Sequence, residues 1–336
     1  MSVRAPCAGR TTAVRAAGLE TCARASQDEA AQSDGRRGPR RKETTMTKEQ
    51  TLAVLGLGAM GARMAHNLLA DGARLTVWNR SPDAARALAD AGATLAESPR
   101  AAAEGASVVI ACVRDDEAAR AVWLDPEGGA LGGLAAGALA IESSTLTPAT
   151  VRALDVALTK AGARFVEAPV VGSRPQAEAR ALVHLVGARD ADFEAAAPVL
   201  ARLGKAAHHL GAPGQAAVMK LVVNAYFATQ AAALGELLGF AAKAGIDMER
   251  ATDLLAALPI TSPALAGLAR LVVEGAYAPL FPVELVEKDL AYALTAARAV
   301  GRALPTTAGA HAAFRSALEA GDGALNIQGV AKQFLP

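Results

Sequence analysis

The chain has 336 residues, of which 52% are hydrophobic and only 4% aromatic, and its formal net charge is +1. This length is enough for two domains with a sizeable core. The near-neutral charge gives no reason to expect nucleic acid or an anionic membrane as a partner. The cysteines, Cys7, Cys22 and Cys112, are irregularly spaced. Neither a disulfide framework nor a zinc site is therefore predicted, and a reducing, cytoplasmic location is expected.

The first 45 residues differ in composition from the rest. They combine many arginines with Gly, Ser and Thr and lack a sustained apolar period. This pattern predicts a disordered tail or a stretch upstream of the true start, with Met46 as the start codon. An organelle transit peptide is the alternative, because arginine is frequent here. The acidic residues Glu20, Asp28, Glu29 and Asp34 argue against it.

Short apolar runs alternate with helical patterns from Thr51 onwards. A strand at 52–55 ends in a glycine turn, and a helix at 59–71 follows, with Met60, Met64 and Leu68 on one face. The further expected strands are 75–78, 108–112, 138–142 and 164–168, and the further expected helices are 82–91, 116–123 and 148–161. Strands that alternate with helices of this length predict a parallel sheet covered on both faces.

The pattern changes after Gly211, where the strands stop. Residues 215–244 predict one long, almost wholly apolar helix, and helices dominate to Phe314. The longest uncharged run in it, 221–235, is too short and too polar to cross a bilayer. A helix that is apolar on most sides is buried in its own domain or against another subunit. We therefore expect an all-α C-terminal domain built around a long buried helix, and a homo-oligomer formed through the C-terminal helices.

The glycine turn has the sequence Gly56-Leu57-Gly58-Ala59-Met60-Gly61. In a dinucleotide-binding Rossmann unit, the first glycine permits the tight turn, the second lets the backbone approach a pyrophosphate, and the third allows close packing of helix on strand. The helix N-terminus then presents free N–H groups to the phosphates. The motif alone is weak, but it lies between an expected strand and an expected helix, which favours dinucleotide binding over a structural turn.

The end of the second strand carries Asn79-Arg80-Ser81. NAD-binding Rossmann units usually place Asp or Glu here, to accept a hydrogen bond from the ribose 2′-hydroxyl. A guanidinium instead pairs with a 2′-phosphate. The sequence therefore predicts NADP(H) in preference to NAD(H), although an ordinary surface arginine is the alternative. The expected domains are a tail (1–45), an NADP-binding Rossmann domain (46–212) and a helical substrate and oligomerisation domain (213–336).

Lys220 is the foremost catalytic candidate. It lies one turn into the long apolar helix, and Asn224 follows four residues later on the same face. A lysine among apolar neighbours loses hydration, which lowers its pKa and suits a general acid that donates a proton to a carbonyl oxygen. A lysine that extends from a helix end into solvent remains the alternative at this point.

Five segments in order resemble the β-hydroxyacid dehydrogenase family, which includes 3-hydroxyisobutyrate dehydrogenases and glyoxylate/succinic semialdehyde reductases. The segments are residues 56–61, 142–148, 167–173, 214–224 and 288–290. The resemblance implies that Lys220 is the catalytic lysine and that Asn224 lies beside it in the substrate site. It implies further that Gly172 lies in a substrate-anion loop with Val171 and Ser173, that Thr145 serves cofactor and substrate, and that Lys288 and the backbone at Val113-Arg114 contact the cofactor.

Two departures from the family pattern concern the substrate. The family commonly has serine in the loop where this chain has Val171, and Arg180-Ala181-Leu182 replaces a usual Gly-Thr-Leu. Losing a hydroxyl donor makes the pocket less polar. A small hydroxy acid is therefore in doubt unless Ser173 takes over the polar role. The expected function is hydride transfer between NADP(H) and a short-chain aldehyde or hydroxy acid. The alternatives are an imine reductase and a non-catalytic NADP-binding interaction module.

No metal site is predicted. His208 and His209 have no carboxylate or cysteine at ligand spacing, and neighbouring side chains of a strand point to opposite faces. The acidic run Asp115-Asp116-Glu117 is expected to begin a helix, where acids interact favourably with the helix dipole. Asp289 is expected to orient Lys288 or to cap a helix, and Cys112 to be a small buried residue rather than a nucleophile.

Overall fold

The structure is a computed structural model that describes residues 50–335. The predicted tail at 1–45, the proposed start at Met46 and the cysteines Cys7 and Cys22 lie outside the described residues.

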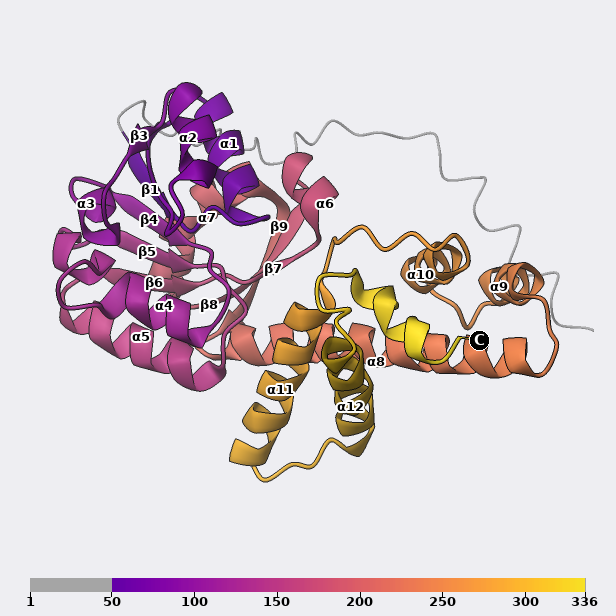
Figure 1. Ribbon diagram of the computed structural model, residues 1–336. Coiled ribbons are helices and arrows are strands. Elements are labelled where there is room, and N and C mark those ends of the chain that lie inside the picture. The colour runs from indigo at the N-terminus through magenta and orange to yellow at the C-terminus, as the bar shows by residue number, and fades with distance from the viewer. Residues whose placement is uncertain (1–49, 336) are drawn as a thin grey trace, which may run out of the picture. The chain divides into compact units, whose positions relative to one another are not determined.

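A nine-stranded sheet forms the first part of the described chain (Figure 1). Its strand order is β3-β2-β1-β4-β5-β6-β8-β7, and β9 also pairs with β8. The strands are β1 (Thr51–Leu55), β2 (Arg74–Trp78), β3 (Thr94–Leu95), β4 (Val108–Ala111), β5 (Leu139–Glu142), β6 (Arg164–Glu167), β7 (Val170–Val171), β8 (Leu182–Ala188) and β9 (Gly204–Gly211).

The expected parallel sheet is confirmed for β1 to β6. The sheet as a whole is mixed, because β8 pairs antiparallel with β6 and with β7. The connection from β7 to β8 contains only the short helix α6 (Arg174–Glu178). A parallel crossover needs about a dozen residues or more, so this connection reverses the chain instead. The sequence analysis made no prediction for the direction of these last strands.

Helices cover both faces of the sheet, and alternation along β1 shows why. Leu52 and Val54 face one core cluster, whereas Ala53 and Leu55 face the other. The helices α1 (Gly61–Ala70), α2 (Asp83–Asp90) and α7 (Asp190–Leu203) contribute to the first cluster, and α3 (Pro99–Ala103), α4 (Asp116–Leu124) and α5 (Pro148–Lys160) to the second, beside the 3-10 turn η1 (Ala130–Gly133).

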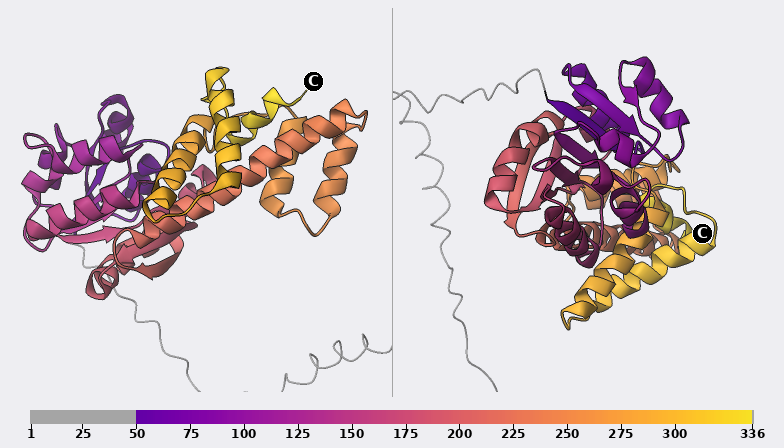
Figure 2. Two further views of the ribbon diagram at one scale, coloured as in Figure 1. Left: turned by 90° about the horizontal axis from the view of Figure 1, so that it is seen from below. Right: turned by 90° about the vertical axis from the view of Figure 1, so that its left-hand side faces the viewer.

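Helices make up the chain after β9. Helix α8 (Gln215–Lys243) begins where the sequence places it and ends one residue earlier. Along it pack α9 (Met248–Ala257), α10 (Pro263–Val273), α11 (Val283–Ala299), α12 (Pro305–Glu319) and the 3-10 helix η2 (Ile327–Gln333), as Figures 1 and 2 show. Their apolar faces form a third core cluster, in which Phe314 is fully buried.

By length and hydropathy alone, α8 could cross a membrane. However, half of its most apolar 18-residue window is buried inside the protein, which is typical of a core helix.

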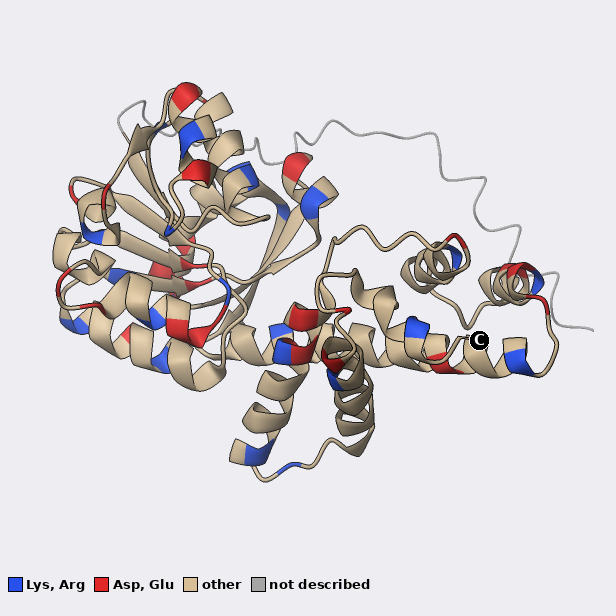
Figure 3. Cartoon of the chain, viewed as in Figure 1, with Lys and Arg blue, Asp and Glu red and all other residues tan. Residues whose placement is uncertain are grey.

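Figure 3 shows basic and acidic positions interspersed over the sheet half and the helical half. The Gly214 N–H, directly before α8, donates to the side chain of Glu167 at the carboxyl end of β6. The first turns of α8 therefore lie at the sheet edge where α/β proteins bind ligands.

Candidate active site

The glycine turn between β1 and α1 is shaped by close packing. Gly56 has φ +89°, and a Cβ there would lie 2.4 Å from the carbonyl oxygen of Cys112. A Cβ at Gly61 would lie 2.0 Å from the carbonyl oxygen of Gly56. Gly58 differs, since no described atom comes within 4 Å of the Cβ position. The first and third glycines are therefore required by the protein itself, and the second faces open space.

The open space at Gly58 lies at the N-terminus of α1. No side chain among residues 50–335 caps this end of the helix at Met60. Free N–H groups, the positive end of the helix dipole and an unobstructed glycine backbone together form an anion-binding site. The residues present therefore fit the pyrophosphate of a dinucleotide.

Asn79, Arg80 and Ser81 follow β2 beside this turn. The Asn79 side chain accepts a hydrogen bond from the Leu57 N–H at 2.9 Å and donates one to the Ser81 carbonyl at 2.8 Å. Asn79 therefore fixes the glycine turn to the end of β2. Arg80 is exposed and forms no hydrogen bond or ion pair with the rest of the described chain. Its guanidinium is therefore free to pair with an anion.

The loops after β4 and β5 are joined by Ser144 and Glu142. The Val113 N–H donates to the Ser144 hydroxyl at 2.7 Å, and the Ser144 N–H donates to the buried Glu142 carboxylate at 2.7 Å. The indole N–H of Trp123 donates to the other oxygen of Glu142 at 2.7 Å. Burial raises the pKa of Glu142 to about 6. These bonds hold Val113 beside the loop that carries Thr145. The neighbouring Arg114 guanidinium lies 3.1 Å from Glu284 of α11.

Lys220 and Asn224 meet as their spacing predicts. The Lys220 ammonium donates to the Asn224 side-chain oxygen at 2.9 Å, and the Asn224 amide donates to Asp289 of α11 at 2.6 Å. All three side chains are buried. Residues on α8 and α11 thus form one chain of hydrogen bonds that ends at the lysine nitrogen.

Burial lowers the pKa of Lys220 from 10.5 to about 8. Removal from water, which disfavours the ammonium, is the main cause, and the nearby Lys288 ammonium acts in the same direction. The Asp289 carboxylate opposes the shift. A lysine with this pKa gives up a proton readily near neutral pH, as general acid–base catalysis requires. The solvent-exposed alternative for Lys220 does not hold, because the residue is only 9% exposed.

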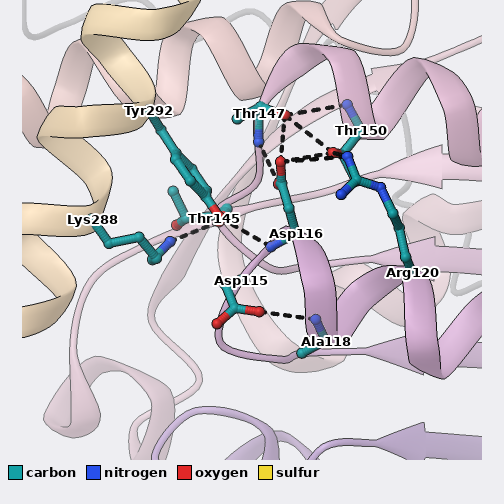
Figure 4. Close-up of polar contacts among 9 residues, drawn as sticks. All are labelled: Asp115, Asp116, Ala118, Arg120, Thr145, Thr147, Thr150, Lys288 and Tyr292. Carbon is teal, nitrogen blue, oxygen red and sulfur yellow. Dashed lines mark hydrogen bonds and ion pairs between the residues drawn. The ribbon is translucent and has the colours of Figure 1, made fainter.

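Lys288 bridges the two halves of the molecule, as Figure 4 shows. Its ammonium donates to the Thr145 carbonyl at 3.0 Å, pairs with Asp289 at 2.8 Å and lies 4.5 Å from the ring centre of Tyr292. The Tyr292 hydroxyl in turn accepts from the Asp116 N–H at 3.1 Å. The lysine is therefore held beside the loop that precedes α5.

The loop after β7 uses its polar groups internally. The Ser173 hydroxyl donates to the Leu280 carbonyl at 3.0 Å, and the Ser173 N–H donates to the Gln176 side chain at 2.9 Å. Ser173 therefore connects this loop to the segment before α11. Its hydroxyl proton is already donated, so it is a poor replacement for the donor that Val171 lacks. Gly172 has φ +126°, a conformation that favours glycine.

Arg180, in the second departure from the family pattern, forms an ion pair with Asp71 at the end of α1. It therefore stabilises the sheet half from outside. Within residues 50–335, its side chain bonds to Asp71 and Asn67 and not to Lys220.

The acidic and histidine residues for which no metal site was predicted make other contacts. Asp115 caps α4 by accepting from the Ala118 N–H, and Asp116 accepts from Thr147, so the acidic run does begin a helix. His209 stacks on Phe193. Within residues 50–335, no group of three or more His, Cys, Asp or Glu side chains is arranged to hold a metal ion. Burial raises the pKa of Cys112 to about 12, which keeps the thiol neutral.

The sequence analysis did not foresee the full contacts of three polar residues of the site. Asp289 was expected to orient Lys288 or cap a helix, but it also holds Asn224. Glu142 and Glu167 were quoted only as members of motifs, yet both are buried carboxylates that bind backbone N–H groups. The available signal was the position of each Glu at the carboxyl end of a buried strand, where ligands and catalytic groups gather in α/β proteins.

Comparison with known families and proteins agrees with this architecture. Residues 51–211 match the NAD binding domain of 6-phosphogluconate dehydrogenase, and residues 214–334 match the NAD-binding domain of NADP-dependent 3-hydroxyisobutyrate dehydrogenase. Glyoxylate/succinic semialdehyde reductase 1 of Arabidopsis thaliana is 35% identical over 279 residues, covering 83% of this chain and 96% of the relative.

Solved structures are similar as well. A 3-hydroxyisobutyrate dehydrogenase from Salmonella typhimurium superposes with a TM-score of 0.77 at 26% identity, over 85% of this chain and all of that one. A reductive aminase from Aspergillus terreus, solved with NADPH and ethyl levulinate, gives a TM-score of 0.55 at 25% identity, over 85% of this chain and 99% of that one. These matches agree with the glycine cradle (Gly56, Gly58 and Gly61) and the lysine cluster (Lys220, Asn224 and Asp289). Together they show that the chain belongs to the β-hydroxyacid dehydrogenase family of NAD(P)-dependent oxidoreductases.

Proposed function

We propose that the protein is an NADPH-preferring reductase of short-chain aldehydes, in which Lys220 donates the proton to the carbonyl oxygen. The observation that carries this proposal is the buried chain from Lys220 through Asn224 to Asp289, with a lysine pKa of about 8. A bound reduced nicotinamide supplies the hydride that completes the reduction.

The residues divide the work between them. Asn224 orients the Lys220 ammonium by accepting a hydrogen bond from one of its N–H groups, which leaves the other two N–H groups for a substrate oxygen. Asp289 fixes the Asn224 amide and provides a negative charge that keeps enough of the lysine protonated near pH 7. In the reverse direction, the neutral lysine accepts the proton of a hydroxyl group. The same residue therefore serves as acid for reduction and as base for oxidation.

The substrate class follows from the relatives and from the loop at Val171. The Arabidopsis relative is named for glyoxylate and succinic semialdehyde, and the Salmonella structure for 3-hydroxyisobutyrate. In this chain the loop offers an isopropyl group at Val171, while the Ser173 hydroxyl is bonded to Leu280. We therefore expect aldehydes with an apolar or longer chain to be used better than glyoxylate.

The test is NADPH oxidation with a matched panel: glyoxylate, succinic semialdehyde, methylglyoxal and several uncharged short aldehydes. Turnover that requires Lys220 supports the proposal, and higher kcat/KM for uncharged aldehydes supports the assignment of Val171. Val171→Ser restores the missing hydroxyl and should improve glyoxylate relative to the uncharged aldehydes. Absence of turnover with every carbonyl, despite measurable NADPH binding, would refute the proposed reaction.

Preference for NADPH rests on Arg80, whose guanidinium is free of other protein contacts in the described chain. A hydrogen bond to a charged group is worth about 1.5–3 kcal/mol, which is roughly 10- to 100-fold in affinity. Arg80→Ala should therefore weaken NADPH by that factor and leave NADH unchanged. Arg86→Ala is the matched control, because Arg86 is exposed nearby and pairs with Asp83. Equal weakening of both cofactors would contradict the assignment.

Imine reduction is the second candidate, because the chain also resembles the Aspergillus terreus reductive aminase. The two candidates separate cleanly in an assay of ketone–amine mixtures against aldehydes alone. Carbonyl reduction needs a proton donor at oxygen, and Lys220 provides one. Faster NADPH oxidation with cyclic imines than with any aldehyde would favour the second candidate.

We further propose that the protein forms a homo-oligomer through its helical half. Large apolar side chains are exposed along α8 and beyond it, including Val222, Tyr226, Phe240, Leu254 and Ile260. Many large exposed apolar side chains in one half of a protein favour association through that half. Light scattering coupled to gel filtration should give a multiple of the chain mass. Tyr226→Glu and Phe240→Glu together should reduce that mass, whereas a monomeric wild-type protein would refute the proposal.

A further inference from the structure

The carboxylate of Glu167 has no role in the reaction as proposed, yet it lies at the start of the catalytic helix. Glu167 is the last residue of β6 and is 1% exposed. The Gly214 N–H donates to its Oε2 atom at 2.7 Å, and the backbone N–H groups of Ala216 and Ala217 act on the same carboxylate. Lys220 follows on the next turn of α8. The charge therefore lies at the positive end of the helix that carries the lysine.

A glycine on the neighbouring strand makes room for this carboxylate. A Cβ at Gly187 of β8 would lie 2.3 Å from Glu167 Oε2 and 3.1 Å from the Ala212 carbonyl oxygen. The Gly187 backbone does not have a positive φ, so its conformation does not require glycine. The Glu167 side chain therefore requires glycine at position 187. This close packing indicates that the carboxylate is held in one orientation.

Glu142 provides an internal comparison. It is directly opposite Glu167 in the register of β5 and β6, so both side chains point to the same face of the sheet. Glu142 binds the Ser144 N–H and the Trp123 indole and so fixes the loops on the cofactor side. Glu167 binds α8 instead. Two adjacent buried carboxylates thus hold two different parts of the site.

We propose that Glu167 is a positioning residue for Lys220: its carboxylate anchors the first turn of α8 to the sheet and thereby sets where the lysine nitrogen lies relative to the nicotinamide side of the cleft. This inference rests on the proposed function. Glu142 has the corresponding role for the loops after β4 and β5 on the cofactor side. The two carboxylates are therefore expected to affect different kinetic quantities.

The protonation state of Glu167 responds to its surroundings. Burial and the neighbouring Glu142 carboxylate raise its pKa to about 7, although the three backbone N–H groups act in the opposite direction. On the α8 side, the Arg152 guanidinium lies against Gly214, and Lys220 is the titratable group nearest along the helix. The ionised form accepts hydrogen bonds most strongly. The anchor is therefore strongest above pH 7 and weakens as the pH falls through 7.

The test compares Glu167→Gln with Glu142→Gln and with Glu194→Gln, a surface control on α7. The readouts are kcat from pH 6 to 8, the NADPH Kd, and hydrogen exchange of the segment 212–221. Glu167→Gln should lower kcat at least about 10-fold at pH 8 and less at pH 6, leave the NADPH Kd unchanged, and speed exchange in 212–221. Glu142→Gln should raise the NADPH Kd and leave exchange in 212–221 unchanged.

Gly187→Ala displaces the Glu167 carboxylate without changing its chemistry, and it decides the matter if Glu167→Gln does not fold. It should reproduce the loss of kcat and the faster exchange. Unchanged exchange in 212–221 and wild-type kcat in the folded variants would overturn the inference, and so would a loss of kcat that is equal at pH 6 and pH 8. Hydrogen exchange needs no turnover, so the positioning role is tested even if the wild-type protein reduces none of the aldehydes.

Discussion

The glycine cradle and the lysine cluster differ in what they are made of and in how far apart their residues lie in sequence. The cradle at Gly56, Gly58 and Gly61 is made of backbone and empty space, and its shape depends on contacts within one strand–turn–helix unit. The cluster of Lys220, Asn224 and Asp289 is made of buried side chains from two helices, and Asn224 and Asp289 are 65 residues apart in sequence. The cradle binds by geometry and a helix dipole. The cluster works because a low-dielectric environment makes its few charges strong.

This difference predicts different responses to mutation. Changes in the cluster should affect the chemical step while cofactor binding is retained. Changes in the cradle should affect cofactor binding or folding while the lysine keeps its pKa.

Lys220→Ala should have the largest effect. Loss of a general acid or base usually costs about 10²- to 10⁴-fold in rate, so kcat should fall within that range while the NADPH Kd stays near the wild-type value. Lys243→Ala is the matched control, because Lys243 is exposed at the other end of the same helix. Steady-state kinetics and NADPH fluorescence titration provide the two numbers. A drop of less than threefold in kcat would remove Lys220 from the reaction.

Asp289→Asn should have the next largest effect. It removes a charged acceptor from Asn224 and the ion-pair partner of Lys288. A hydrogen bond to a charged group is worth about 1.5–3 kcal/mol, so kcat should fall roughly 10- to 100-fold. The variant should also move the basic limb of the reduction profile to lower pH, because Asp289 raises the pKa of Lys220. Glu287→Gln is the control, since Glu287 lies on the same helix as Asp289 and pairs with His311 of α12.

If Asp289→Asn lowers kcat but leaves the basic limb in place, Asp289 orients Asn224 without acting electrostatically on the lysine. A basic limb that moves to higher pH would contradict the sign of the interaction.

Two glycine substitutions sharpen the comparison within the cradle. Gly61→Ala forces a Cβ against the Gly56 carbonyl and should destabilise the fold by about 1–3 kcal/mol, seen as a lower Tm. Gly58→Ala meets no described protein atom. It should keep the wild-type Tm and weaken NADPH binding roughly 10-fold, through contact with the pyrophosphate. Wild-type NADPH affinity in Gly58→Ala would show that the pyrophosphate does not approach this backbone.

The sequence predicted the local features of this molecule well. The glycine turn, the helix that follows it and the pairing of Lys220 with Asn224 all depend on spacing within one or two elements, which periodicity and motif order capture. The long helix α8 was also located to within one residue, because nothing else in the chain has such an uninterrupted apolar run.

Long-range features were missed for a physical reason. The antiparallel direction of β8 depends on a chain reversal through the five-residue helix α6. A helix this short has no apolar period that could reveal the reversal from sequence. Asp289 and Glu167 act on residues far away in sequence, and nothing in their immediate neighbours indicates which helix they will meet. The engagement of Ser173 by Leu280 is a contact of the same kind.

The most direct test of the central claim is the pH dependence of both reaction directions in the wild-type enzyme at saturating cofactor. The pKa of Lys220 is lowered to about 8, so the protonated donor is lost as the pH rises through 8 and the neutral acceptor is gained. The account predicts that aldehyde reduction falls and alcohol oxidation rises across the same interval near pH 8, with both limbs absent from the residual activity of Lys220→Ala. Limbs that run in the same direction, or that persist in Lys220→Ala, would contradict it.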